Sequence, residues 1–170
     1  MFVHLADLLD VAVLVSEAHG GLPLVYCNNA AARLTRYSVS EMLGRSCRFL
    51  QGPDTEDEAV GRLSASLRAA ESASVELTNY RKDGSQFRNA LFLQPVHDSC
   101  GACRYVIGLQ ADAADSPSVR RAATVFRLLP TRFAAELQPA PLTALVPEAQ
   151  LHTQWRSSLA ALSRLALCAD

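Results

Sequence analysis

The chain has 170 residues, with 16 basic and 17 acidic side chains and an apolar fraction of 49%. This length allows one domain with extensions, or one and a half domains, and the apolar fraction supports a hydrophobic core. The nearly balanced charge gives no overall electrostatic case for a nucleic acid or a membrane as partner.

Cysteine usage and the N-terminal sequence bear on the compartment. The 5 cysteines are irregularly spaced, which is not the pattern of a secreted disulfide framework. The N-terminus has no basic region typical of a signal peptide, and the aliphatic stretch at residues 11–15 is too short to span a bilayer. We therefore expect a cytoplasmic or nuclear protein that is neither secreted nor transmembrane.

The first half of the chain predicts two strands followed by helices. Apolar spacing predicts a short helix over residues 1–10, and apolar runs predict strands at 11–15 and 22–27. Asn28 or Asn29 is the predicted N-cap of a helix that runs to Tyr37. Ser38 or Ser40, together with Glu41, predicts a short helical turn that ends at Gly44. Pro53 and the acidic residues after it predict a helix over 54–70.

The following stretch predicts three more strands. Alternating residues place these strands at 74–80, 87–96 and 104–111, and the sequence RKDG at 81–84 predicts a turn between the first two. The order of strands and helices predicts an α+β domain with an antiparallel five-stranded sheet and its helices on one face.

The composition changes near Asp112. All 8 glycines lie at or before Gly108, whereas 5 of the 8 prolines lie after Asp112. Ser116 and Pro117 predict the cap and first position of a helix to about Leu129, which Pro130 ends. We expect three segments: an N-terminal flanking helix at 1–10, the domain at 11–114, and a helical, proline-interrupted extension at 115–170 for output or dimerisation. An apolar stripe predicts a second helix in this extension, at 148–168.

The stretch Gly44–Pro53, GRSCRFLQGP, contains the residue of greatest chemical interest, Cys47. A lone cysteine in an apolar neighbourhood is most often a small packing residue. Arg48 places a cation next to this thiol, and a neighbouring cation favours the thiolate form. The residues alone therefore permit either packing or reactivity.

This stretch resembles the signature of the LOV (light-oxygen-voltage) family, a subset of the PAS domains. The segments NYRKDG, FRNALF and YVIGLQ then resemble the family's strand motifs in the same order. The resemblance implies a PAS/LOV fold, a bound flavin, and a blue-light photoreceptor in which Cys47 forms a reversible bond to the flavin carbon C4a.

Three amides, Asn79, Asn89 and Gln110, lie within predicted strands. Asparagine is a poor strand former, and a buried amide needs partners for both its donor and its acceptor. The resemblance implies that both asparagines bind the polar edge of the flavin and that Gln110 faces its N5 side as the signal switch. From the residues alone, Asn79 or Asn89 could instead face solvent.

The resemblance implies a flavin site, with FMN preferred and riboflavin or FAD as alternatives. We expect Arg48 to hold the phosphate. The expected binding residues are Ser46, Arg48, Leu50, Gln51, Val60, Leu63, Asn79, Asn89, Leu91, Leu93, Gly108 and Gln110. Leu14, Leu67 and Val106 are expected to complete the apolar wall of the site. We expect no metal, because the pair Cys100 and Cys103 has no second pair of ligands after it.

Three positions depart from the family pattern. Ser46 and Leu22 stand where the family usually or often has asparagine, and Ser64 stands where many members have a second arginine. The first two remove amides near the ring, so the adduct lifetime should differ. The third weakens the expected grip on a phosphate.

We expect the signal to pass from Gln110 along the last strand to the flanking helices. We also expect these helices to form a homodimer. No nucleophile elbow or glycine-rich phosphate loop is present, so we do not expect an enzyme. Two alternatives stay open: a flavin redox sensor that forms no adduct, and a flavin-free PAS dimerisation module.

Overall fold

The computed structural model describes residues 10–132. The strands are β1 (Ala12–Glu17), β2 (Leu24–Cys27), β3 (Ala73–Tyr80), β4 (Gln86–His97) and β5 (Cys103–Asp112). The helices are α2 (Asn29–Thr35), α3 (Val39–Met42), the 3-10 helix η1 (Cys47–Leu50), α4 (Asp57–Ala69) and α5 (Ser116–Phe126). The helix expected at residues 1–10 and the one at 148–168 lie outside the described residues.

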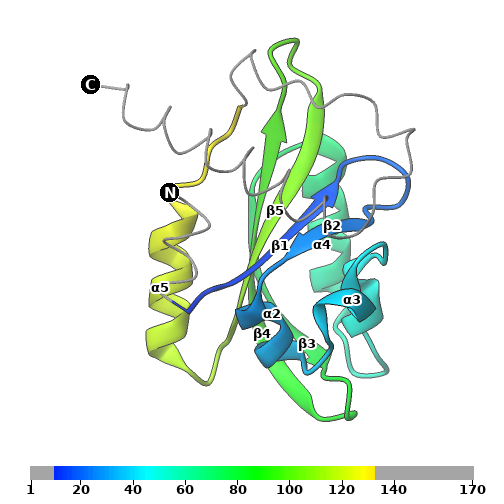
Figure 1. Ribbon diagram of the computed structural model, residues 1–170, viewed down its shortest axis with the longest axis vertical. Helices are drawn as coiled ribbons and strands as arrows, with labels where there is room; N and C mark the ends of the chain where they lie inside the picture. The colour runs from blue at the N-terminus through cyan, green and yellow to red at the C-terminus, as the bar shows by residue number, and fades with distance from the viewer. Residues whose placement is uncertain (1–9, 133–170) are drawn as a thin grey trace.

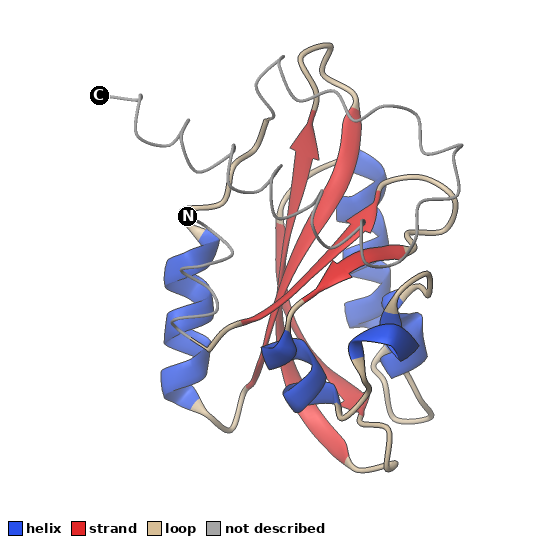
Figure 2. Ribbon diagram, in the orientation of Figure 1, coloured by secondary structure: helices blue, strands red, loops and turns tan. Residues whose placement is uncertain are grey.

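The five strands form one antiparallel sheet in the order β2-β1-β5-β4-β3. Helices α2, α3 and α4 lie on one side of this sheet and α5 lies on the other (Figure 1). Figure 2 shows the strands passing between these two groups of helices. The expected five-stranded PAS/LOV arrangement is confirmed, and the first helix of the C-terminal extension covers the opposite face.

Alternation along the strands separates the two faces. On β5, Gly108 and Gln110 point to the inner face, which α2, α3 and α4 cover, whereas Ile107 and Leu109 point to the outer face. The outer face packs on α5 through Ala122 and other buried residues. Each face therefore has its own apolar layer, and the sheet lies between them.

Asn28 fixes the junction between β2 and α2. Its side-chain oxygen accepts from the backbone N–H of Ala31, which caps α2, and from that of Val13 at 3.0 Å. Its Nδ2 donates to the carbonyl of Val11. One buried amide thus caps the helix and holds it to the start of β1.

The helix predicted from residue 54 begins instead at Asp57. The side chain of Thr55 donates to the carbonyl of Thr78, and the backbone N–H of Asp54 donates to the hydroxyl of Tyr80. These residues bind strand β3, so the acidic run serves as a clamp before the helix begins. Likewise, α5 ends at Phe126, not at Leu129, and its N-cap is Asp115 in place of Ser116.

Glu56 completes this clamp and is held as a carboxylate. It accepts from the backbone N–H of Thr78 at 2.7 Å and from the Thr78 hydroxyl, and it forms an ion pair with Arg88. The backbone hydrogen bond from Thr78, together with the contacts to Arg88, lowers the pKa of Glu56 to about 2.

We expect the stabilisation from Glu56 to be lost as pH falls. A pKa lower in the folded state than in the unfolded state stabilises the fold at pH above the unfolded value of roughly 4.3, and the effect disappears as pH approaches the folded value. The variant Glu56→Gln should therefore be less stable than the natural sequence at pH 7 and equally stable near pH 2.

Urea unfolding at several pH values measures this difference. The control is Glu58→Gln, because Glu58 lies on α4 and pairs only with Arg62 at an exposed site. If the difference in unfolding free energy between Glu56→Gln and the natural sequence did not change with pH, the lowered pKa of Glu56 would be contradicted.

Candidate functional site

A cavity lies between the inner face of the sheet and the segment that carries η1 and α4. Its lining residues are Leu14, Ser16, Leu22, Ser46, Cys47, Arg48, Leu50, Gln51, Val60, Leu63, Ser64, Leu67, Leu77, Asn79, Leu91, Leu93, Val106, Gly108 and Gln110. The lining is mostly aliphatic, with a few amides, hydroxyls, one thiol and one guanidinium. This is the composition of a site for a flat, largely apolar ligand with a polar edge.

Cys47 reaches the cavity because its backbone is held on both sides. The preceding residues attach to β2: the N–H of Gly44 donates to the carbonyl of Leu24 at 2.7 Å, and the N–H of Leu24 donates to that of Arg45. On the other side Leu50, only 1% exposed, anchors the end of η1 in the core. The thiol is therefore presented from a fixed 3-10 turn.

An aromatic pair supports this turn from behind. The rings of Tyr37 and Phe49 meet edge to face with centroids 4.8 Å apart, and the guanidinium of Arg45 lies 4.2 Å from the Phe49 centroid. Such contacts stabilise the position of a ring beyond the area that it buries. Phe49 thus points away from the cavity while Cys47 lines it.

The expectation that Arg48 favours a thiolate is wrong. Burial raises the pKa of the Cys47 thiol to about 12, and the neighbouring Cys27 adds to the rise. The side chain of Arg48 is exposed, so water screens its charge. Desolvation therefore outweighs the nearby cation, and Cys47 is a neutral thiol at neutral pH.

The three predicted amides lie together on neighbouring strands. Asn79, Asn89 and Gln110 are all buried, and the Nδ2 of Asn89 donates to the Oδ1 of Asn79 at 2.8 Å. Asn79 and Gln110 line the cavity, whereas Asn89 lies behind Asn79. Asn89 therefore orients Asn79 in this structure.

Two amide oxygens in this group have no partner among the described residues: Oδ1 of Asn89 and Oε1 of Gln110. A buried polar atom without a partner costs on the order of 1–3 kcal/mol, so such atoms point to a missing ligand or water. A flavin fits this set because its polar edge offers both donors and acceptors.

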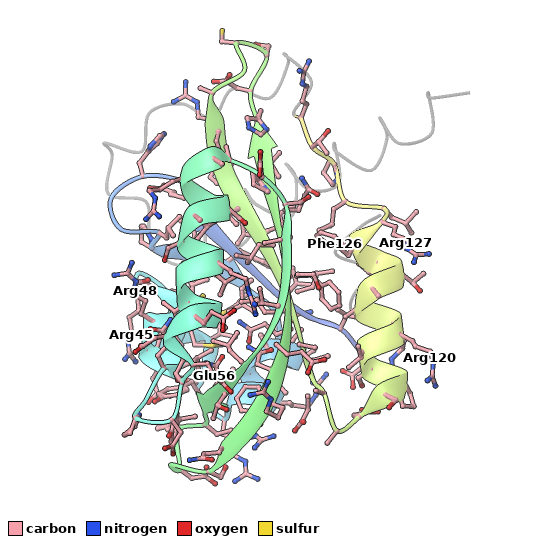
Figure 3. All side chains as sticks on the ribbon, turned by 180° about the vertical axis from the view of Figure 1, so that it is seen from behind. Arg45, Arg48, Glu56, Arg120, Phe126 and Arg127 are labelled. Carbon is pink, nitrogen blue, oxygen red and sulfur yellow. The ribbon has the colours of Figure 1, made fainter. Side chains whose placement is uncertain are left out.

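Arg48 and Ser64 also line the cavity. The side chain of Arg48 has no ion pair or hydrogen bond within residues 10–132, which leaves its donors free for an anion. Figure 3 shows Arg48 and Arg45 on the α4 side of the sheet, with Arg120 and Arg127 on α5 across it. Ser64 lines the cavity as expected, and Arg62 is paired with Glu58 instead.

Leu22 also lines the cavity, and its backbone is unusual. Its φ of 64° lies in the left-handed region, which asparagine and glycine tolerate better than leucine. A branched apolar side chain in this conformation costs on the order of 1 kcal/mol. Leu22 therefore adopts the left-handed conformation although its side chain is not an amide.

All the predicted binding residues except Asn89 line the cavity. Sequence reasoning missed Ser16 and Leu77. Both follow from alternation, because Ser16 shares a strand face with Leu14, and Leu77 shares one with Asn79. Within the described residues, no His, Cys, Asp and Glu side chains group as metal ligands, and no helix has the length and apolarity to cross a membrane.

Comparison with known proteins decides the family. The model of the PAS domain matches residues 10–113. The LOV domain of the Erythrobacter litoralis EL346 blue-light activated histidine kinase is 38% identical, with a TM-score of 0.58, and the match covers 61% of this chain and 95% of that one. This chain contains a LOV domain of the PAS family.

Longer relatives extend the comparison. Blue-light-activated histidine kinase 1 of Erythrobacter litoralis is 39% identical over 139 residues, which is 81% of this chain and 38% of that protein. The Oryza sativa protein Phototropin-2 is 40% identical over 93 residues, 55% of this chain and 10% of that protein. The LOV chain thus spans well under half the length of these relatives.

We expect Gly52→Ala to destabilise the LOV domain by about 1–3 kcal/mol, because overpacking a close contact costs this much. A Cβ on Gly52 would lie 2.4 Å from the ring of Tyr80. The ring cannot move freely, since the Tyr80 hydroxyl donates to Asp54 at 2.8 Å and accepts from its N–H. Urea unfolding gives the free-energy change.

Gly61→Ala is the matched control. Gly61 lies on α4 with open space where a Cβ would stand, so alanine should stabilise the helix by about 1 kcal/mol. Unfolding of Gly52→Ala at the same urea concentration as the natural sequence would refute the close contact.

Proposed function

We propose that this LOV domain senses blue light through a bound flavin, and that FMN is the form it holds. The observation that carries the proposal is that a neutral thiol, Cys47, lines the same cavity as Asn79 and Gln110, and that the Oε1 of Gln110 has no partner within residues 10–132. The relatives of this chain include blue-light-activated histidine kinases, which supports the same conclusion.

Cys47 would act as a complete S–H group. When bound, a flavin supplies the light-absorbing ring and the carbon C4a to which sulfur adds. Because the thiol is protonated, Cys47 would be able to supply its sulfur to C4a and its hydrogen to ring nitrogen N5. In the dark Cys47 would regain both, so no external acid or base would be consumed.

Gln110 would detect the new proton. Within residues 10–132 the Oε1 of Gln110 is a buried acceptor without a partner, and it would be able to accept from a flavin N5 that had become a donor. Rotation or re-pairing of this amide avoids an unmet hydrogen bond worth on the order of 1–3 kcal/mol. That energy is enough to shift a two-state equilibrium about tenfold.

Arg48 would hold the phosphate of FMN, because its guanidinium lines the cavity and has free donors. Ser64 stands in place of a second arginine, so the phosphate has one arginine to bind instead of two. The difference in affinity between FMN and riboflavin should therefore be smaller than in a site with two arginines. FAD is less favoured, since no insertion is present to house an adenine.

Output would pass to a dimer or to an attached effector. One structural relative is the light-state dimer of the fungal blue-light photoreceptor Vivid, whose sequence is 30% identical to this chain and whose structure matches with a TM-score of 0.59. By analogy, the flanking segments 1–10 and 148–168 would form a homodimer in this protein. The relatives named as kinases are much longer than the matched region, so kinase activity belongs to their other parts in this proposal.

Removal of the thiol should abolish the light reaction. Protein supplied with FMN should lose its flavin absorbance in blue light and recover it in the dark, whereas Cys47→Ala should bind flavin and show no such reversible loss. Absorption spectra before and after illumination measure both. The control is Cys27→Ala, because Cys27 is buried near Cys47 but does not line the cavity.

The same spectra separate the alternatives. A light-induced signal that survives in Cys47→Ala would favour redox sensing without an adduct. A colourless protein after flavin supplementation would favour a flavin-free PAS module. Either result would refute the proposed adduct.

Ser46→Asn should lengthen the dark recovery. Ser46 lines the cavity next to Cys47, and a larger side chain there would keep water from the bond. We expect a change of roughly fivefold in recovery time, equivalent to one ordinary hydrogen bond or buried contact. Recovery of absorbance in the dark measures the lifetime. Ser46→Ala is the control, and an unchanged lifetime in Ser46→Asn would contradict the role of this position.

A further inference from the structure

The end of β5 connects the predicted switch residue to helix α5. Gln110 and Asp112 lie on the same face of β5 because they are two residues apart, and Gln110 pairs with Ala12 of β1 and with Leu91 of β4. Asp112 is the last residue of β5, and α5 begins at Ser116. Asp112 therefore lies between Gln110 and α5 along the chain.

The guanidinium of Arg81 donates hydrogen bonds to three different segments, one of which is Asp112. Its Nη2 donates to the Oδ2 of Asp112 at 2.7 Å, its Nε to the carbonyl of Leu34 at the end of α2, and its Nη1 to the carbonyl of Gln86 at the start of β4. Its guanidinium also lies 4.5 Å from the ring centroid of Phe87. Arg81 thus ties the last residue of β5 to α2 and β4.

This ion pair differs from the others in the described part of the chain. The side chains of Arg81 and Asp112 are 17% and 27% exposed, whereas in every other pair at least one partner is more than 45% exposed. Exposed pairs contribute little, but a covered, charge-assisted hydrogen bond contributes more. Arg81 with Asp112 is therefore the ion pair most able to hold a segment in place.

Asp112 also shapes the connection to α5. Its Oδ1 accepts from the N–H of Ala114 at 3.1 Å, and its carbonyl accepts from the N–H of Asp115 at 2.9 Å. Asp115 in turn caps α5 through the N–H of Ser118. The hydrogen bonds run without a break from Arg81 to the first turn of α5.

There is room beside this connection for it to move. A polar cleft lies next to it, and Gln110, Arg81, Asp112, Asp115 and Ser118 all line that cleft. Gln110 also lines the flavin cavity, so it forms part of the wall between the two spaces. A shift of the Asp112 side chain toward this cleft would displace solvent.

We propose that the Arg81–Asp112 ion pair is a latch that holds α5 on the sheet in the dark and is loosened when Gln110 re-pairs. Arg81 is a positioning residue in this scheme, since it does not line the flavin cavity. The inference rests on the proposed function for its trigger. The dark-state part of the latch depends only on the contacts described above.

Hydrogen exchange of the full chain, loaded with FMN, tests the latch in the dark and under blue light. In Asp112→Asn, which keeps the shape and removes the charge, amides of α5 should exchange about tenfold faster in the dark, as expected for loss of a charge-assisted hydrogen bond. Illumination should then add little, although absorbance shows the same adduct yield. Arg81→Gln should behave in the same way.

Arg104→Gln is the matched control, because Arg104 forms an ion pair with Asp98 near the opposite end of β5. It should leave α5 exchange unchanged. A purely structural role for Arg81 would raise exchange across the whole sheet and leave the difference between light and dark in α5 intact, and that result would overturn the latch.

The two proposals fail in different ways. Dark exchange of α5 in Asp112→Asn equal to that of the natural sequence overturns the latch, whether or not an adduct forms. A natural sequence that binds FMN and shows no reversible loss of absorbance overturns the adduct, and the dark exchange still decides the latch.

Discussion

The two-residue alternation of β5 is the constraint on which the site depends. It places Gly108, Gln110 and Asp112 in one row on the inner face, while Ile107, Leu109 and Ala111 form the outer face under α5. A shift of register by one residue would turn the whole row to the other face. Pairing with β1 on one side and β4 on the other fixes this register, so the central strand carries both the cavity wall and the connection to α5.

Burial decides the chemistry of the cysteine. Sequence neighbours suggest a thiolate beside an arginine, but the folded chain surrounds the sulfur with apolar residues and leaves the guanidinium in water. A screened charge does not compensate for removal of a thiolate from water. The site is therefore built for a neutral S–H group, and the nearby amides are neutral as well. Such a site can read a ligand through hydrogen bonds without a buried charge.

Much of the fold follows from sequence alone, because strand alternation, turn glycines and caps are local. Asn28, Ser38 and Gly84 each mark an element boundary through their own backbone or side-chain chemistry. The sequence also predicts the cavity side chains of β3, β4 and β5, helped by resemblance to the LOV family. Expectations failed where a local signal competes with a distant partner. The acidic run after Pro53 bonds to β3 in place of starting a helix. The hydrogen bond between Asn89 and Asn79 also could not be predicted from either residue alone, and the role of Asn89 toward a flavin stays a prediction. The exposure of Arg48, and hence the charge state of Cys47, likewise depends on tertiary packing.

The most direct test of the account is the infrared difference spectrum of the FMN-loaded protein between light and dark. A neutral Cys47 that adds to the flavin must lose its S–H stretching band on illumination and regain it in the dark, and Cys47→Ala must lack this change. Adduct formation without loss of an S–H band would mean that the sulfur begins as a thiolate, and would contradict the account.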